Sequence, residues 1–106
     1  MRKKTMEILV KMGIPVDIQG FHYICDAMEI YAQDESFIKS KTCVLYQKIA
    51  DQNGTSATGV ERCMRHAFMK AVNNGQLDVL NKYRVVSQKN TNRNLLACLY
   101  MTLREM

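Results

Sequence analysis

The sequence of 106 residues lacks the features that mark membrane and secreted proteins. No apolar run approaches the roughly 20 residues that a membrane-spanning helix needs. The first residues do not have the pattern of a secretory signal. We therefore expect a cytoplasmic protein with no membrane partner.

Cysteine is present, but without the spacing of a metal site or a redox motif. Cys25, Cys43, Cys63 and Cys98 are far apart, and none forms a Cys-x-x-Cys pair. Cys63 and His66 share one helical turn, but two ligands do not make a metal site. We expect no metal and no cofactor, and reduced thiols that are mostly buried.

Patterns typical of catalysis are also missing. The carboxylates show no paired arrangement, and no glycine-rich phosphate loop follows a strand. His22 and His66 have no identifiable nucleophile partner, and His22 stands at the start of an amphipathic helix, where histidine is more often structural. The sequence predicts a protein that is not an enzyme and has no catalytic residue.

No segment alternates as a strand would, whereas apolar residues recur at helical spacing. The clearest set, at i, i+3, i+4, i+7 and i+10, is Phe21, Ile24, Cys25, Met28 and Tyr31. Further helices are predicted at about residues 2–12, 46–54, 56–73, 77–83 and 95–103, with a turn at 37–41 and a polar loop at 87–92. Gly13 and Gly20 should interrupt the chain. We expect an all-α fold, a compact bundle of five or six helices in one domain over residues 1–106.

The segment from Thr42 to Gly75 has the pattern of a helix-turn-helix. Gly54, after Asn53, supplies the left-handed residue that ends the first helix. Ala50 is small where two steeply crossing helices must approach closely. The residues of the first helix that should face inward are Val44, Leu45 and Ile49.

The start of the second helix carries several hydroxyl groups. Thr55 and Ser56 can accept hydrogen bonds from the first amides of that helix. Glu61, three residues after Thr58, would allow a capping box. A stop signal follows at residues 73–75, which read Asn-Asn-Gly.

The second helix separates into two faces when its residues are placed at about 100° each. The apolar face consists of Val60, Met64, Ala67, Phe68 and Ala71. The polar face consists of Thr58, Arg62, Arg65 and His66, with Glu61 on its flank. A recognition helix enters the major groove in this way, with one face docked and cations on the other. The alternative is a helical hairpin with an ordinary solvated charged face.

Charge is distributed unevenly along the chain. The net charge is +3 over residues 2–4, −5 over 5–38, +4 over 39–70 and +3 over 71–106. Positive charge thus lies on the helix-turn-helix and the C-terminal part, as expected of a nucleic-acid-binding face. The acidic segment should face away from DNA, as a protein-contact surface or as a solvated face, and it includes Asp26, Glu29, Asp34 and Glu35.

Several short motifs occur along nearly the whole chain. They are Ile14-Pro15-Val16 after a glycine, Gly20 before an aromatic helix, Val44-Leu45-Tyr46, Ile49-Ala50, the run from Val60 to Ala67, Gly75-x-Leu77-Asp78 and Thr91-Asn92. Together they resemble the C-terminal effector domain of the master response regulator of sporulation initiation, most specifically between Val60 and Ala67.

This resemblance implies an all-helical fold, binding to a short DNA box in the major groove, and contact with an RNA polymerase sigma factor. In that family the domain follows a phosphorylatable receiver domain that controls dimerisation. We expect residues 1–106 to be a single helix-turn-helix effector-like domain without a receiver domain.

Three positions depart from the family pattern. Gly59 and Asn74 stand where the family has arginine, and Cys43 stands where it has lysine. Each change removes a cation from the expected DNA face. DNA binding is therefore expected to be weaker, altered in sequence preference, or lost.

The leading hypothesis is a sequence-specific, DNA-binding transcription regulator with a recognition helix at about residues 56–73. Arg62 and Arg65 would contact bases or phosphates, and Glu61 would accept from a cytosine amino group. The other expected contacts are to the backbone or nearby base edges from Ser56 and Thr58, to a phosphate from His66, and non-specifically from Lys41, Lys48 and the N-terminal cations. One helix reads few base pairs, so a homodimer or tandem copies on double-stranded DNA are expected.

An alternative from another class is a receiver-less protein-interaction module. It would pair with a full-length relative or a sigma factor and modulate that partner. The acidic segment and the missing cations motivate this alternative.

Overall fold

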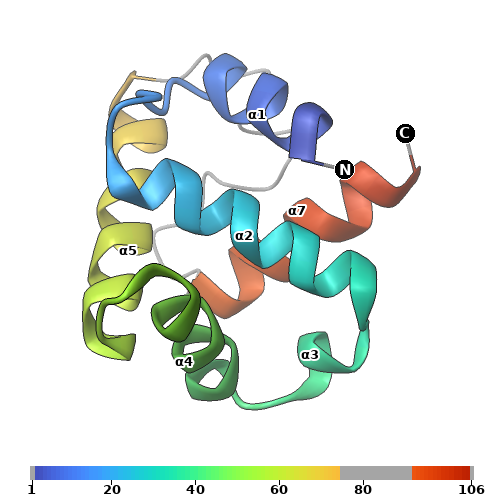
Figure 1. Cartoon of the computed structure of the whole chain (residues 1–106). Helices are drawn as coiled ribbons and strands as arrows, with labels where there is room; N and C mark the ends of the chain where they lie inside the picture. The colour runs from blue at the N-terminus through green and yellow to red at the C-terminus, as the bar shows by residue number, and fades with distance from the viewer. Residues whose placement is uncertain (1, 75–91, 106) are drawn as a thin grey trace.

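The computed structural model describes residues 2–74 and 92–105, and all regular elements within these ranges are helices (Figure 1). They are α1 (Arg2–Lys11), α2 (Gln19–Gln33), α3 (Ser36–Lys39), α4 (Thr42–Asn53), α5 (Ala57–Asn74) and α7 (Asn92–Glu105). The predicted all-α bundle is confirmed. The short helix predicted at 77–83 and most of the predicted polar loop at 87–92 lie outside the described residues.

Helix α2 is the centre of the bundle, and each of the other described helices packs against it. Figure 1 shows it crossing the middle of the molecule, between α1 on one side and α4 on the other. Nine of its 15 residues are buried, which is too many for a single apolar stripe and requires neighbours on several sides.

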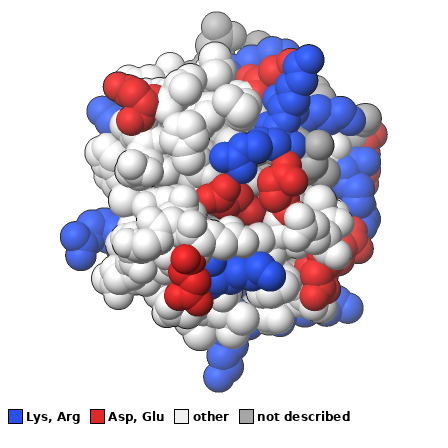
Figure 2. Space-filling model, viewed as in Figure 1, with Lys and Arg blue, Asp and Glu red and all other residues white. Residues whose placement is uncertain are grey.

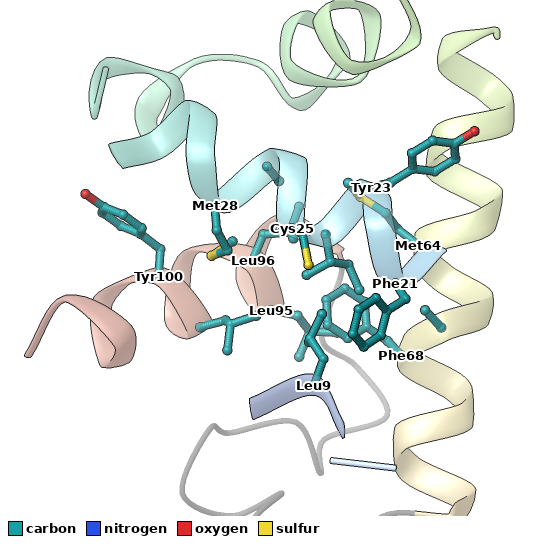
Figure 3. Packing of buried hydrophobic residues seen from close by; sticks show 14 of the residues in the cluster. Leu9, Phe21, Tyr23, Cys25, Met28, Met64, Phe68, Leu95, Leu96 and Tyr100 are labelled. Carbon is teal, nitrogen blue, oxygen red and sulfur yellow. The ribbon is translucent and has the colours of Figure 1, made fainter. Parts of the chain in front are cut away.

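The core is formed where α1, α2, α5 and α7 meet. In Figure 3 the ring of Phe21 lies beside that of Phe68, with Leu9 from α1 and Leu95 from α7 close to them. Phe21 and Leu9 are completely buried, and Phe68 and Leu95 nearly so. Burying each such side chain contributes about 1.5–3 kcal/mol relative to an exposed one, so these contacts stabilise the packing of the four helices.

The predicted inward faces are largely confirmed. All five periodic residues of α2 are buried, as are the four leucines of α7, Leu95, Leu96, Leu99 and Leu103. The prediction was wrong for Val44, which is 50% exposed, because the buried face of α4 consists of Leu45, Tyr46, Ile49 and Ala50. Val44 lies beyond the edge of that face, beside Phe37 in a groove between α3 and α4.

Gly20 was predicted to interrupt the chain, and this was wrong, because it lies inside α2 and is buried. A Cβ atom at this position would lie 2.2 Å from the carbonyl oxygen of Cys63 and 2.8 Å from the Cβ of Ala67. Glycine is needed here because α2 and α5 approach closely, with backbone against backbone. The absence of a side chain therefore sets the distance between the central helix and α5.

The four cysteines differ in their surroundings, and all are free thiols. Only Cys25 is buried, whereas Cys63 and Cys98 are half-buried and Cys43 is exposed, so the prediction of mostly buried thiols was wrong. Burial raises the pKa of Cys25 to about 11, and this thiol stays protonated at neutral pH. The exposed and half-buried thiols lie on the amphipathic helices α4, α5 and α7. Residue spacing alone does not show whether a cysteine lies at the centre of the buried face of such a helix or at its edge.

Polar contacts at the surface join helices that are far apart in sequence. Asp26 of α2 accepts from Arg2 of α1 at 2.9 Å and from the amide of Asn53, at the end of α4, at 3.1 Å. Glu35 accepts from Arg104 at 2.6 Å and from the hydroxyl of Tyr100 at 3.0 Å. These bonds, to Arg104 first and then to Tyr100, lower the pKa of Glu35 below its ordinary value. The C-terminal part of α7 is thus attached to the corner between α2 and α3.

The described helices are not of the membrane-spanning type, since none combines sufficient length with sufficient apolar character. Figure 2 shows that the face over α1 and α2 carries acidic and basic side chains next to one another. That face has no large area of positive charge alone, which binding to a polyanion such as DNA would require.

The close contact at Gly20 leads to a stability prediction. Gly20→Ala should lower the free energy of unfolding by about 1–3 kcal/mol or more, because the new methyl group meets backbone atoms that cannot rotate away. Urea denaturation followed by circular dichroism measures the change. Gly59→Ala is the matched control, since its methyl group would meet only the hydroxyl oxygens of Ser56 and Thr55 at 3.1 and 3.2 Å. Equal stability of Gly20→Ala and the native protein would show that the two helices do not need this close approach.

Candidate nucleic-acid interface

Helices α4 and α5 are joined by a turn of three residues, 54–56. Gly54 has a left-handed backbone with φ of 67°, and its amide donates to the carbonyl oxygen of Ala50. The amide of Thr55 donates to the same oxygen at 3.0 Å. The predicted end of α4 at Asn53-Gly54 is therefore confirmed, with the bond pattern of a left-handed helix cap.

Ser56 is the N-cap residue of α5. Its hydroxyl oxygen accepts from the amide of Gly59 at 3.0 Å, and its carbonyl oxygen accepts from the amide of Val60 at 3.0 Å. The capping box predicted for Thr58 and Glu61 is wrong, because Thr58 already lies inside the first turn. The hydroxyl nearest the start of the helix takes the cap position, and Glu61 pairs instead with Arg65.

The two predicted faces of α5 are confirmed. The buried residues of this helix are Val60, Met64, Ala67, Phe68 and Ala71. Thr58, Arg62, Arg65 and His66 are exposed, and Glu61 is half-buried on the flank. The helix that was predicted at 56–73 spans Ala57–Asn74, one residue later at each end.

One flank of this outward face adjoins a polar hollow between α4, α5 and α7, which we call the α7 hollow. It is lined by Thr42, Tyr46, Glu61, Arg65, Asn92, Arg93 and Asn94. Arg65 and Glu61 form an ion pair at 3.3 Å, and the side chain of Arg65 is 59% exposed. Such an exposed i,i+4 pair is worth only about 0.2–0.5 kcal/mol, so the guanidinium group can exchange it for another anion.

Asn92, at the start of α7, connects this helix to the helix-turn-helix. Its side-chain amide donates to the backbone carbonyl oxygen of Glu61 at 3.1 Å and is also hydrogen-bonded to Tyr46. Burial, with a smaller effect of the Glu61 carboxylate, raises the pKa of Tyr46 against the opposing effect of Asn92. The tyrosine hydroxyl is therefore neutral at physiological pH and lines the α7 hollow as a hydrogen-bonding group.

The opposite flank of α5 adjoins a smaller hollow at the start of α2. Its lining consists of Ile18, Gln19, Gly20, Arg62, Cys63 and His66. Arg62 and His66 therefore lie on the side towards α2, whereas Arg65 lies on the side towards α7. Within residues 2–74 and 92–105, the structure records no ion pair for Arg62.

The two lysines predicted to contact DNA are separated by the structure. Lys41 is exposed and immediately precedes α4, next to Thr42 of the α7 hollow. Lys48 lies 5.2 Å from the ring centre of Phe37, in the groove between α3 and α4. The fold thus brings Lys41 near the flank that carries Arg65, but places Lys48 on a different side of α4.

Sequence reasoning missed the residues that α7 and α4 bring to this surface, which are Tyr46, Asn92, Arg93 and Asn94. The sequence prediction placed Asn92 at the end of a polar loop and assigned residues 93 and 94 to no element. The Thr91-Asn92 motif was the available signal, although nothing in the sequence says which helix Asn92 contacts.

Most of the acidic segment is engaged within the molecule. Asp26 bonds Arg2 and Asn53, and Glu35 bonds Arg104 and Tyr100. Asp34 accepts from the amide of Ser36 at 3.0 Å. Hydrogen bonds from the Ser36 side chain, and then from this amide, lower the pKa of Asp34. These carboxylates are thus engaged in contacts within the molecule: Asp26 and Glu35 with other helices, and Asp34 with the start of α3.

The part of the chain that the structure describes contains no group of three His, Cys, Asp or Glu side chains placed to hold a metal ion. Cys63 and His66 lie together in the hollow beside α2, without a third ligand. The ring of His22 bonds the carbonyl oxygen of Val16 at 2.9 Å, which is a structural contact.

Comparison with known families gives a match over residues 5–103, to the family described as sporulation initiation factor Spo0A C terminal. The match covers nearly the whole chain and confirms the resemblance to the sporulation effector domain. This family is that of the DNA-binding, regulatory effector domain of a sporulation regulator.

The N-cap at Ser56 leads to a prediction about stability. Ser56→Ala should lower the free energy of unfolding by about 0.5–2 kcal/mol, because the amide of Gly59 loses its acceptor. Thr55→Ala removes a neighbouring hydroxyl that does not cap the helix, and should change stability by less than about 0.5 kcal/mol. Thermal unfolding of the two variants makes the comparison, and equal losses would contradict the assignment of Ser56 as the cap.

Proposed function

This chain belongs to the Spo0A C-terminal family, and we propose that it is a sequence-specific DNA-binding transcription regulator acting in the cytoplasm. The observation that carries the proposal is the outward face of α5. Arg62, Arg65 and His66 are exposed there, on a helix whose opposite face is fixed in the core. Docked on one side and cationic on the other, α5 has the properties of a recognition helix in the major groove.

The two flanks of α5 suit the two backbones that border a major groove. Arg62 and His66 face the side of α2, and Arg65 faces the side of α4 and α7. In this arrangement Arg62 and Arg65 contact guanine edges or phosphates, and His66 contacts a phosphate. Glu61 accepts from a cytosine amino group once Arg65 has turned towards the DNA.

The hydroxyl groups at the start of α5 have different capacities in this proposal. The Ser56 hydroxyl oxygen is occupied by the amide of Gly59, and its remaining hydrogen can be donated to a DNA phosphate. Thr58 is exposed in the first turn and contacts the backbone or a nearby base edge. Lys41 and Lys48 contribute general attraction to the polyanion.

A recognition helix of this kind reads only a few base pairs, so we propose that two copies bind side by side or as a dimer. Contact with an RNA polymerase sigma factor, implied by the family resemblance, belongs to the same proposal. The competing role as a protein-interaction module was motivated by the acidic segment and by the missing cations. Of the acidic segment, the carboxylates of Asp26 and Glu35 are already engaged in bonds within the molecule.

The main test is fluorescence anisotropy with duplexes selected from a random pool. Arg62→Ala with Arg65→Ala should lower the affinity for the selected duplex by about 2 kcal/mol or more, since each arginine that reads a base supplies roughly 1–3 kcal/mol of discrimination. Arg104→Ala is the matched control, because Arg104 is exposed on α7 and paired with Glu35. Binding that ignores sequence, or that survives the double substitution, would contradict the proposal.

A second test restores a cation of the family pattern. Gly59 lies in the first turn of α5, near only two hydroxyl oxygens, so a long side chain can extend outward there. Gly59→Arg should raise DNA affinity, by up to the roughly 1–3 kcal/mol of a bidentate contact to guanine. Gly59→Ala gives the same gain in helix propensity without a charge. A rise in affinity of equal size in both variants would assign the effect to helix stability rather than to the guanidinium group.

A further inference from the structure

The α7 hollow contains a cation that does not belong to the helix-turn-helix. Arg93, in the first turn of α7, lines this hollow together with Arg65 of α5 and Thr42 of α4. The side chains of Arg93 and Arg65 are both exposed. Among the described residues, 2–74 and 92–105, none forms an ion pair with Arg93. Two guanidinium groups from helices far apart in sequence thus line one polar hollow.

The charges of the lining residues determine which ligand fits. Arg65 and Arg93 supply two positive charges, Glu61 supplies one negative charge, and Tyr46 is neutral. The hollow therefore has a net charge of +1, with the hydroxyls of Thr42 and Tyr46 as additional hydrogen-bond donors. A single phosphodiester group, with its one negative charge, balances this set, whereas a free nucleoside triphosphate would leave a large excess of negative charge.

The position of the hollow agrees with that ligand. In a helix-turn-helix complex the recognition helix lies in the groove while the first helix crosses the DNA backbone. The α7 hollow lies where the beginning of α4 meets the flank of α5, so it borders the place where a backbone passes. The bond between Asn92 and the carbonyl oxygen of Glu61 holds the start of α7 at this place.

We propose that Arg93 and Arg65 together hold one backbone phosphate of the bound DNA in the α7 hollow. This inference rests on the proposed function, and it adds to it a DNA contact from a helix outside the helix-turn-helix. Arg93 sets affinity and register but reads no base. The exposed pair of Arg65 with Glu61 opens when the phosphate enters, because the phosphate offers Arg65 a bidentate acceptor.

The test measures the affinity of the full chain for the selected duplex and for a scrambled duplex over a range of salt concentrations. Arg93→Gln should weaken binding to both duplexes by the same factor, on the order of three- to tenfold at low salt. It should also reduce the slope of log affinity against log salt by about 0.9, the value for one lost phosphate contact. Arg93→Lys should keep most of the slope, since lysine also binds phosphate as a point charge.

Arg104→Gln is the control, because it makes the same charge change on the same helix roughly 16 Å away, at 1.5 Å per residue. Arg104→Gln should leave the slope of log affinity against log salt unchanged. Thermal unfolding of Arg93→Gln should match that of the native protein, which shows that the variant folds. An unchanged slope in Arg93→Gln, with native binding intact, would overturn the phosphate contact and leave the proposed function standing. A changed preference among sequences in Arg93→Gln would show that Arg93 reads a base, which would overturn its assignment to a phosphate. Failure of the native chain to bind any duplex would overturn both proposals.

Discussion

The arrangement of this molecule depends on the contact between α2 and α5 at Gly20. There the backbone of the central helix lies against the carbonyl group of Cys63, with no side chain between them. Close approach brings Phe21 and Phe68 together and buries the apolar face of α5 along its length. A wider spacing would leave a cavity beneath Met64 and Ala67, which interiors packed at crystal-like density do not tolerate cheaply. The orientation of the outward face of α5 is therefore a consequence of packing on the inward face.

The helix-turn-helix combines this packing with local hydrogen bonding at the turn. Gly54 ends α4 and Ser56 begins α5, so the crossing of the two helices is determined within three residues. Helix α7 packs on the other side of α5. It is attached through Asn92 to Glu61 near the start of α5, and through Tyr100 and Arg104 to Glu35. The proposed DNA-binding surface is thus held in place by α2, which packs against the buried face of α5, and by α7, which packs against one flank of α5.

Much of the fold could be predicted from the sequence because it follows from local rules. Helical periodicity identified five of the nine buried residues of α2, all those of α5 and the four leucines of α7, and Asn53-Gly54 identified the end of α4. The failures concern features that depend on tertiary contacts. Gly20 has the appearance of a helix breaker until the neighbouring helix is known, and Val44 is apolar although it lies outside the buried face. For the same reason the sequence indicated the exposed arginines of α5 but not the contribution of Arg93, which α7 brings from 28 residues beyond Arg65.

Helix α5 also has a consequence for how such a domain diversifies. Its inward residues are constrained by the crossing with α2, where even a methyl group is too large at Gly20. Its outward residues contact little else in the molecule, so substitutions there cost almost no folding energy. Under the proposed function, substitutions on this outward face would change the target sequence one residue at a time, while the scaffold beneath remains the same.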